Sequence, residues 1–255
     1  MKTVILAGGV GNRLAGTTEV GPKPLIEIGE RPILWHVMSH YSHFGFSEFI
    51  VAAGYRGDLI KRYFMDYHVA QHDVRIHVAT GKVEIATPPD IADWVVDVID
   101  TGLGTQSGGR IKRLSPQLGH EPFMATFGDG VGDIDLIALL DFHRSHGRIA
   151  TVTAAHPSPR FGELRLDGDL VVEFSEKPME AGWVFAGYMV FEPGVFEYIT
   201  GDDEPISPES IARLAKDGEL MAYRHEGFFH GVDTLRDIAT LQELWSSSSP
   251  PWKVW

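Results

Sequence analysis

The sequence contains no cysteine, no long apolar run and no excess of basic residues. The missing cysteine excludes a disulfide framework, thiolate catalysis and cysteine-ligated zinc, and it suits a reducing compartment. No apolar run approaches the roughly 20 residues that would span a bilayer. The formal net charge of −13 argues against a general nucleic-acid binder, which needs a basic face. We therefore expect a cytoplasmic protein that binds neither nucleic acid nor membrane.

What the chain does have is enough apolar sequence for a packed core. Of its 255 residues, 44% are hydrophobic and 22% are charged, a composition typical of globular domains. The apolar run near the N-terminus ends at once on Gly8-Gly9. We interpret this run as a first β-strand and not as a signal peptide.

Strand-like and helix-like patterns alternate along the first part of the chain. Leu34, Val37, Met38 and Tyr41 recur at helical spacing within 32–45. A second helical pattern covers 58–69, and a third lies around 136–143. Strand-like runs are found at 3–9, 49–55, 74–80, 94–102, 122–130 and 149–156. This alternation predicts an α/β fold, a Rossmann-like, mostly parallel sheet sandwiched by helices.

The second part of the chain contains more hairpin-like patterns, which we expect to form a mixed β lid. Residues 160–178 predict a hairpin and 185–193 a further strand. Ser207 and Pro208 predict the start of a helix, and Thr234 with Asp237 predicts a capping box at the start of another. The tail at 247–255 predicts a loose end whose tryptophans can pack on a neighbouring surface.

We expect a single domain over 1–255. Its 1–150 half is expected to bind mainly the nucleotide, and 151–246 mainly the sugar, for reasons given below.

The turn after the first strand reads Gly8-Gly9-Val10-Gly11-Asn12-Arg13. A dinucleotide loop needs a third small residue, but Leu14 stands there, and a Walker loop is absent. Consecutive glycines still let backbone N–H groups approach an anion closely, and an arginine adds donors suited to phosphate. From this turn alone, a phosphate site and a plain tight turn remain equally open.

A lysine follows between two prolines, Pro22 and Pro24. Proline on both sides restricts the backbone, so Lys23 is held out from a stiffened loop. Farther along, Asp129 lies between Gly128 and Gly130 at the end of a predicted strand. Ligands of parallel α/β sheets bind at that edge, where a carboxylate suits Mg²⁺.

These motifs resemble those of the sugar-1-phosphate nucleotidylyltransferases, and the details are most similar to the glucose-1-phosphate cytidylyltransferase branch. The resemblance covers nearly the whole chain. It includes "LAGGVGNRL", "PKPLIEIGERPILWH", "GGRIKR", "GDG", "EKP", "DTLRD" and the terminal "PWKVW". The first of these motifs marks only the broad superfamily, whereas the combination is much narrower.

The resemblance implies a role for each matching residue. Asp129 and Asp233 would jointly hold Mg²⁺. Arg13 and the Gly8–Gly11 backbone would hold the β- and γ-phosphates, and Lys23 would stabilise charge near the α-phosphate, which makes Arg13 and Lys23 the catalytic residues. Lys177 would meet the phosphate of the sugar and Glu176 a sugar hydroxyl. The remaining nucleotide contacts would come from Leu6, Gly8, Gly9, Val10, Gly11, Asn12, Thr105, Arg110 and Gly128. The run at 107–110, Ser-Gly-Gly-Arg, predicts a second glycine turn whose backbone could contact the edge of a pyrimidine.

The implied reaction joins CTP and a sugar 1-phosphate, such as glucose 1-phosphate, to give a CDP-sugar and pyrophosphate. A different nucleotide, or another sugar or cyclitol phosphate, is the runner-up. An inactive nucleotide-sugar-binding regulator that keeps the fold is an alternative of another class. Family members tend to form homo-oligomers, so a homo-oligomer is expected. The histidines at 36, 40 and 43 are interpreted as helix surface or packing, not as zinc ligands.

The sequence departs from the family in the second half. The family has Asn-Gly-Gly in the strand after "EKP", but here Phe185 and Ala186 replace the asparagine and the first glycine. His230-Gly231-Val232 likewise precedes Asp233 where the family has Pro-Met. Loss of an amide that bonds a hydroxyl should change which sugar is accepted.

Overall fold

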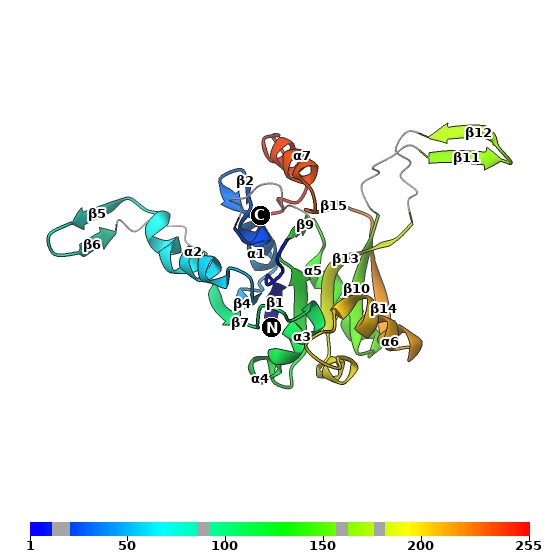
Figure 1. Cartoon of the computed structure of the whole chain (residues 1–255), viewed down its shortest axis with the longest axis horizontal. Helices are drawn as coiled ribbons and strands as arrows, with labels where there is room; N and C mark the ends of the chain where they lie inside the picture. Colours follow the sequence, from blue (N-terminus) through cyan, green and yellow to red (C-terminus); the bar gives the residue numbers. More distant parts are fainter. Residues whose placement is uncertain (12–20, 86–91, 157–162, 176–181) are drawn as a thin grey trace.

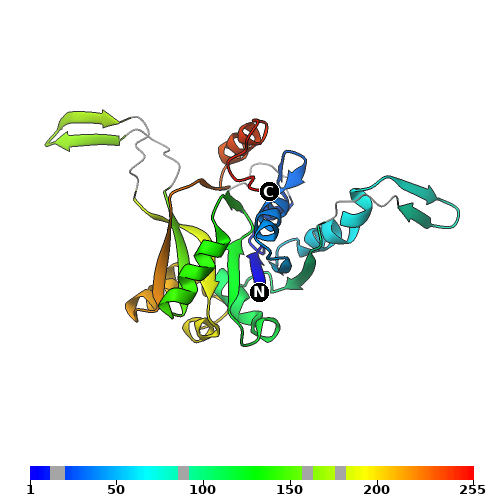
Figure 2. The same cartoon turned by 180° about the vertical axis from the view of Figure 1, so that it is seen from behind.

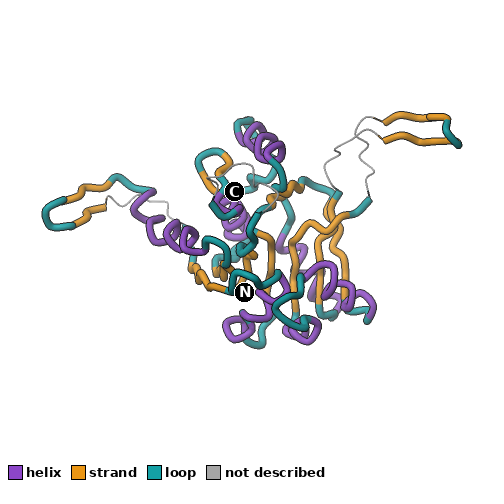
Figure 3. Tube along the Cα trace, in the orientation of Figure 1, coloured by secondary structure: helices purple, strands orange, loops and turns teal. Residues whose placement is uncertain are grey.

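The structure is a computed structural model, and it describes residues 1–11, 21–85, 92–156, 163–175 and 182–255. Its centre is one sheet, in the order β14-β10-β13-β8-β1-β4-β7 (Figures 1 and 3). Within the described ranges this sheet has seven strands: β1 (Lys2–Leu6), β4 (Glu48–Ala53), β7 (Val95–Asp100), β8 (Phe123–Phe127), β10 (Ala150–Ala155), β13 (Val184–Phe191) and β14 (Leu220–His225). The predicted α/β class is confirmed.

Strand direction divides the sheet. β1 pairs in parallel with β4 and β8, β4 pairs in parallel with β7, and β10 pairs in parallel with β14. β13 lies between β8 and β10 and is antiparallel to both. The apolar run at 185–193 was predicted to belong to the lid, and this prediction is wrong. Its side chains from Ala186 to Phe191 are buried, because both of its edges are paired and both faces of the sheet are covered at that point.

Helices cover both faces of the sheet. They are α1 (Ile33–His43), α2 (Gly57–Ala70), α3 (Ser107–Arg113), α4 (Ser115–Leu118), α5 (Leu136–His146), α6 (Ile211–Lys216) and α7 (Leu235–Trp245). Shorter helical turns lie at Lys23–Leu25, Pro193–Tyr198 and Ile206–Ser210. In the ranges described, no helix combines the length and apolar character needed to cross a membrane.

Two hydrophobic clusters show which helices share a face. Side chains alternate along a strand, so Ile5 of β1 packs in one cluster and its neighbours Val4 and Leu6 pack in the other. The first cluster takes in α1, α2, α5 and α7, and the second takes in α3, α4 and α6. Figures 1 and 2 show α6 and α5 on opposite sides of the sheet.

Among the residues that the structure describes, four short strand pairs lie outside the central sheet. They are β2 (Glu27–Ile28) with β3 (Arg31–Pro32), β5 (Val74–His77) with β6 (Lys82–Ile85), β9 (Gly130–Gly132) with β15 (Phe229–Gly231), and β11 (Glu163–Asp167) with β12 (Leu170–Ser175). The hairpins β5–β6 and β11–β12 extend away from the sheet (Figure 1). The strand predicted at 74–80 is therefore half of a separate hairpin and not part of the parallel sheet.

The predicted helices differ in how well they match the structure. The apolar stripe of α1 is fully buried, and α2 spans 57–70 against the predicted 58–69. The capping box of Thr234 and Asp237 at the start of α7 is confirmed. The helix predicted from Ser207 is found in two pieces. Ser207 has extended backbone angles, as an N-cap does, and the helical residues that follow belong to the turn Ile206–Ser210 and to α6 at 211–216.

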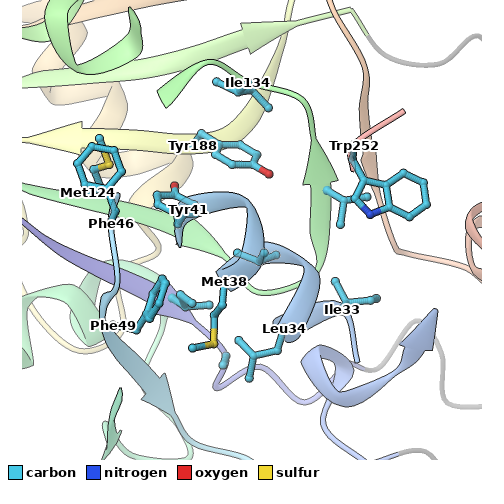
Figure 4. Packing of buried hydrophobic residues seen from close by; sticks show 14 of the residues in the cluster. Ile33, Leu34, Met38, Tyr41, Phe46, Phe49, Met124, Ile134, Tyr188 and Trp252 are labelled. Carbon is cyan, nitrogen blue, oxygen red and sulfur yellow. The ribbon is translucent and has the colours of Figure 1, made fainter. Parts of the chain in front are cut away.

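The C-terminal tail packs against the body instead of lying loose. Trp252 is 1% exposed, and its ring stacks on Trp245 and Phe228. Figure 4 shows Trp252 near Ile33 of α1 in the first hydrophobic cluster. Its indole Nε1 donates a 3.4 Å hydrogen bond to His36 Nδ1. The expectation of a loose end is wrong, whereas the expected packing of tryptophan is confirmed within this chain.

Candidate functional site

The ends of four neighbouring strands form one edge of the sheet. β1, β4, β7 and β8 run in parallel, so their carboxyl ends meet there. The glycine turn follows β1, and the Gly128-Asp129 segment follows β8. Because β13 is antiparallel to β8, the start of β13 reaches the same edge. Residues far apart in the sequence therefore lie side by side at this edge.

A cavity of about 350 Å³ opens at this edge. It is lined by Leu6, Ala7, Gly8, Gly9, Gly11, Lys23, Pro24, Thr105, Gln106, Ser107, Arg110, Phe127, Asp129 and Asp233. We call it the first cavity. Most of the described residues that the sequence analysis assigned to the nucleotide line this cavity together.

Two of the expected nucleotide contacts are not among its lining residues. Val10 is about half exposed, and Gly128 is buried with its backbone N–H bonded to the carbonyl of Leu6. A Cβ on Gly128 would lie 3.1 Å from Pro24 and 3.2 Å from Ile5, so glycine lets this turn pack closely. Asn12, Arg13, Glu176 and Lys177 fall outside the residues that the structure describes.

Arg110 is buried beneath the glycine turn. Its Nη2 donates to the carbonyl of Gly8 at 2.9 Å, and its Nη1 donates to Ala53 O, Thr101 Oγ1 and Gly102 O at 2.7–3.1 Å. The guanidinium therefore joins the ends of β1, β4 and β7. Burial lowers the pKa of Arg110 from its usual value, and its two Nη groups donate to four acceptors. These contacts assign Arg110 a clear role in positioning the turn.

The glycines before Arg110 do not form the expected second glycine turn. They belong to α3, the helix that begins at Ser107. A Cβ on Gly108 would lie 2.7 Å from the carbonyl oxygen of Glu204, and one on Gly109 would lie 2.6 Å from the backbone of Asp202. The interpretation as a turn is wrong because these glycines allow close packing of a helix on the segment around 202–206. That packing brings Thr105, Gln106 and Ser107 to the first cavity.

Lys23 lies between the two aspartates. Its Nζ is 2.6 Å from Asp129 Oδ2 and 3.0 Å from Asp233 Oδ1. Burial alone would lower the pKa of Lys23, but the charges and hydrogen bonds of the two carboxylates outweigh burial and raise it. Lys23 is therefore a permanent cation at the mouth of the first cavity.

Asp233 is held in place by its neighbours. Val232 donates its N–H to the carbonyl of Asp129 at 2.8 Å, which fixes β15 beside the Gly128-Asp129 turn. The N–H of Asp233 donates to Asp237 Oδ2 at 3.0 Å, and the same oxygen accepts from Thr234. The capping box of α7 thus sets the backbone from which the carboxylate of Asp233 extends.

The two carboxylates fit a hard divalent cation. Oxygens from Asp129 and Asp233 converge within 3.0 Å of one point, the Lys23 ammonium, and both side chains keep a third or more of their surface exposed. Mg²⁺ is usually bound by one or two carboxylates, with water and substrate phosphates completing its shell. The described residues contain no group of three or more His, Cys, Asp or Glu side chains placed to hold a metal.

A second cavity of about 270 Å³ adjoins the first. The two cavities share Lys23, Phe127, Asp129 and Asp233. The second is lined by these four and by Thr126, Gly130, Phe185, Ala186, Gly187, Tyr188, Phe229, His230, Gly231 and Val232. One end therefore carries charge, and the first residues of β13 contribute the apolar side chains of Phe185 and Ala186.

Phe127 and His230 border the site, although neither is predicted as a site residue from the sequence. Phe127 lines both cavities, and His230 lines the second with its Nε2 3.3 Å from Asp237 Oδ1. Phe127 directly precedes the Gly-Asp-Gly triplet at the end of a predicted strand, a signal from which it could have been found. His230 lies in a short strand whose pairing with β9 has no local sequence signal.

The histidines of α1 take part in packing. His36 and His40 are buried, whereas His43 is exposed. His36 Nδ1 accepts from Trp252, so its Nε2 carries the proton and donates to the carbonyl of Ile28 at 2.9 Å. Burial lowers the pKa of His36 and of His40 to about 4.

The chain is similar to proteins of one family along almost its whole length. The sequence model of the family described as "Nucleotidyl transferase" matches residues 2–249. Glucose-1-phosphate cytidylyltransferases from Salmonella typhi and Salmonella typhimurium are each 44% identical to it, over 100% of both chains. Among solved structures, HddC from Yersinia pseudotuberculosis superposes with a TM-score of 0.69, at 20% identity, over 96% of this chain and 99% of that one.

Proposed function

The chain belongs to the nucleotidyl transferase family, and from this premise we propose that it is a glucose-1-phosphate cytidylyltransferase. It would join CTP and glucose 1-phosphate, releasing pyrophosphate and CDP-glucose. The observation that carries this proposal is the pair of adjoining cavities, because Lys23, Asp129 and Asp233 border both. A reaction between two phosphorylated substrates needs such a shared charged centre.

We propose that the first cavity binds the nucleotide and the second binds the sugar 1-phosphate. The first cavity is lined by the glycine turn, whose backbone can approach phosphates closely. The second is smaller and bordered by the start of β13 and by β15. This division supports a mainly nucleotide-binding half at 1–150 and a mainly sugar-binding half at 151–246.

The proposed chemistry is an in-line displacement at the α-phosphorus. An oxygen of the sugar phosphate forms a bond to that phosphorus, and the bond to the bridging oxygen of the β-phosphate breaks. The nucleophile is already anionic, so the protein needs to supply positioning and charge neutralisation instead of a strong base. Lys23, whose raised pKa keeps it protonated, neutralises charge where the cavities meet.

Asp129 and Asp233 would hold Mg²⁺ between the two substrates. The bound ion would supply charge stabilisation at the phosphate oxygens and help to orient them. The proposed role of Arg13 is to hold the β- and γ-phosphates. Lys177 would meet the phosphate of the sugar, and Glu176 would bind a sugar hydroxyl. These roles follow from the family resemblance. Assembly into a homo-oligomer is proposed on the same ground.

Pyrophosphate release tests the proposal. The purified chain is given each of CTP, UTP, dTTP, GTP and ATP with glucose 1-phosphate and with other sugar and cyclitol phosphates, in the presence of Mg²⁺. We expect the highest kcat/KM for CTP with a hexose 1-phosphate. If pyrophosphate is released only with another nucleotide, the nucleotide assignment is wrong. If no pair of substrates gives pyrophosphate, the proposed enzymatic activity is contradicted.

A further inference from the structure

The second cavity has two unlike walls. Lys23, Asp129 and Asp233 form its charged end, next to the first cavity. The start of β13 supplies the opposite kind of surface, with the ring of Phe185 and the buried Ala186. A bound sugar phosphate would turn its phosphate toward the charged end and part of its ring toward this apolar wall.

The position of Phe185 is built into the sheet. From Val152 to Ala154 the partner strand β10 advances two residues, while β13 advances four, from Met189 to Phe185. Such a bulge redirects the side chains beside it, and bulges recur next to functional sites. Gly187 lies in the bulge with φ of +80°, a backbone conformation that glycine adopts readily.

The ring of Phe127 packs against the ring of Phe185. The two rings meet edge to face with centroids 6.1 Å apart. A Cβ on Gly187 would lie 2.7 Å from the Phe127 ring, so only glycine leaves room for that ring. Both rings also pack on the second hydrophobic cluster. The wall is therefore supported by the core and is not a side chain free to swing away.

An aromatic wall selects a sugar differently from an amide. A phenylalanine ring can pack on C–H groups but cannot exchange a hydrogen bond with a hydroxyl. Apolar sites discriminate weakly against an added hydroxyl, by about 10²-fold or less, whereas sites that bond a hydroxyl reject its absence by about 10⁴-fold. The β13 side of the cavity should therefore tolerate a missing hydroxyl on the sugar.

We propose that Phe185 is a specificity-determining residue for the sugar. Through it the second cavity accepts hexose 1-phosphates that lack a hydroxyl on the side facing β13, besides glucose 1-phosphate. This inference rests on the proposed function and deepens it by naming a deoxyhexose 1-phosphate as an acceptor class. The polar groups that recognise the phosphate would be unchanged.

A deoxy scan tests the proposal. We would measure kcat/KM with CTP and the 2-, 3-, 4- and 6-deoxy forms of glucose 1-phosphate, for the wild-type chain and for Phe185→Asn. In the wild type we expect at least one deoxy form to fall within about tenfold of glucose 1-phosphate, as an apolar contact allows. In Phe185→Asn the same form should lose at least a further tenfold relative to glucose 1-phosphate.

Phe185→Leu is the matched control, because leucine keeps an apolar surface without a hydrogen bond. Its preference between glucose and deoxy substrates should stay within about threefold of the wild type, since no polar partner is gained. The proposal is overturned if all four deoxy forms lose 100-fold or more in the wild type. It is also overturned if Phe185→Asn leaves the preference unchanged.

A binding measurement separates this proposal from the proposed function. Saturation-transfer difference NMR, with irradiation of the aromatic protons, reports which protons of glucose 1-phosphate lie near aromatic rings without requiring turnover. We expect signal on one edge of the sugar that weakens at least twofold in Phe185→Leu. If the chain shows this signal but releases no pyrophosphate, the proposed contact of the sugar with Phe185 is supported and the proposed reaction is contradicted. If the chain releases pyrophosphate but shows no such signal, only the proposed contact of the sugar with Phe185 is contradicted.

Discussion

The carbonyl oxygen of Gly8 accepts a 2.9 Å hydrogen bond from the guanidinium of Arg110, which lies 102 positions later in the sequence. The same guanidinium bonds the ends of β4 and β7. A single buried side chain thus sets how the glycine turn sits over the sheet edge. The shape of the first cavity depends on it as much as on the turn.

Replacement of Arg110 by lysine should therefore affect both stability and nucleotide binding. A lysine cannot supply the fork of donors, so several buried carbonyls lose their partners. We expect the free energy of unfolding to fall by about 2–4 kcal/mol, from hydrogen bonds to a charged group. The KM for CTP should rise by about tenfold, since a misplaced turn costs binding energy. Urea denaturation and steady-state kinetics measure the two effects.

Arg144→Lys is the control for this variant, because Arg144 is exposed on α5 and forms only a 3.9 Å surface ion pair with Asp141 among the described residues. Such surface pairs contribute about 1 kcal/mol or less. Equal effects of the two substitutions would contradict the positioning role of Arg110.

Asp129→Asn tests the charged centre. The substitution keeps the size of the side chain but removes one of the two carboxylates beside Lys23. We expect kcat to fall by about 10²–10³, the usual effect of losing one preorganised charge contact, with the fold retained by circular dichroism. Asp141→Asn on the exposed face of α5 should keep wild-type turnover. If Asp129→Asn also kept turnover, Asp129 would not be part of the catalytic centre.

Acid should weaken the fold through the buried histidines. His36 and His40 have pKa values of about 4 in the folded chain, below the ordinary 6.5. Between pH 6.5 and 4 the unfolded chain binds protons that the folded chain does not, so stability falls as pH falls. Each histidine contributes on the order of 3 kcal/mol to this loss, which is complete near pH 4.

The variant His40→Leu isolates one of these contributions. Urea denaturation at pH 7.0 and pH 4.5 gives the loss of unfolding free energy on acidification for each protein. We expect a smaller loss in His40→Leu than in the wild type, because leucine cannot be protonated. An unchanged difference between the two pH values would show that His40 is already charged or accessible in the folded chain.

Gly187→Ala should damage the second cavity. An alanine at this position would have to adopt the positive φ of Gly187, which is unfavourable for a residue with a side chain. Its Cβ would lie 2.7 Å from the Phe127 ring. We expect the free energy of unfolding to fall by about 1–3 kcal/mol. Relative to the wild type, the KM for the sugar phosphate should rise more than the KM for CTP. Gly168→Ala is a matched control, since Gly168 also has a positive φ but a Cβ there meets nothing within 4 Å. A KM change in CTP alone would contradict the assignment of the cavities.

Local sequence patterns were sufficient where the structure is local. The stripe from Leu34 to Tyr41 and the capping box of Thr234 and Asp237 depend on neighbours three or four residues away. β13 could not be placed in this way, because its apolar run fits either a lid or a central strand. Only its pairing with β8 and β10, strands well separated in the sequence, decides between them.

The site shows the same division. Lys23, Asp129 and Asp233 stand out in the sequence by their prolines, glycines and element ends, and the structure brings them together. The sequence motif around Arg110 does not indicate that this side chain donates hydrogen bonds to three backbone carbonyls and one hydroxyl. The packing of the tail could not be predicted either, because a stretch rich in serine and proline is typical of loops. The hydrogen-bond partner of Trp252, His36, lies 216 positions earlier in the sequence.

The docking of Trp252 on His36 has a consequence for synthesis of the protein. A ribosome adds about 5–20 residues per second, so α1 emerges tens of seconds or less before the indole that completes its surroundings. Until then the nascent chain exposes an apolar site between α1 and α7. Final closure of the first hydrophobic cluster must therefore wait until Trp252 has been synthesised, and until then its exposed apolar side chains are a target for chaperones.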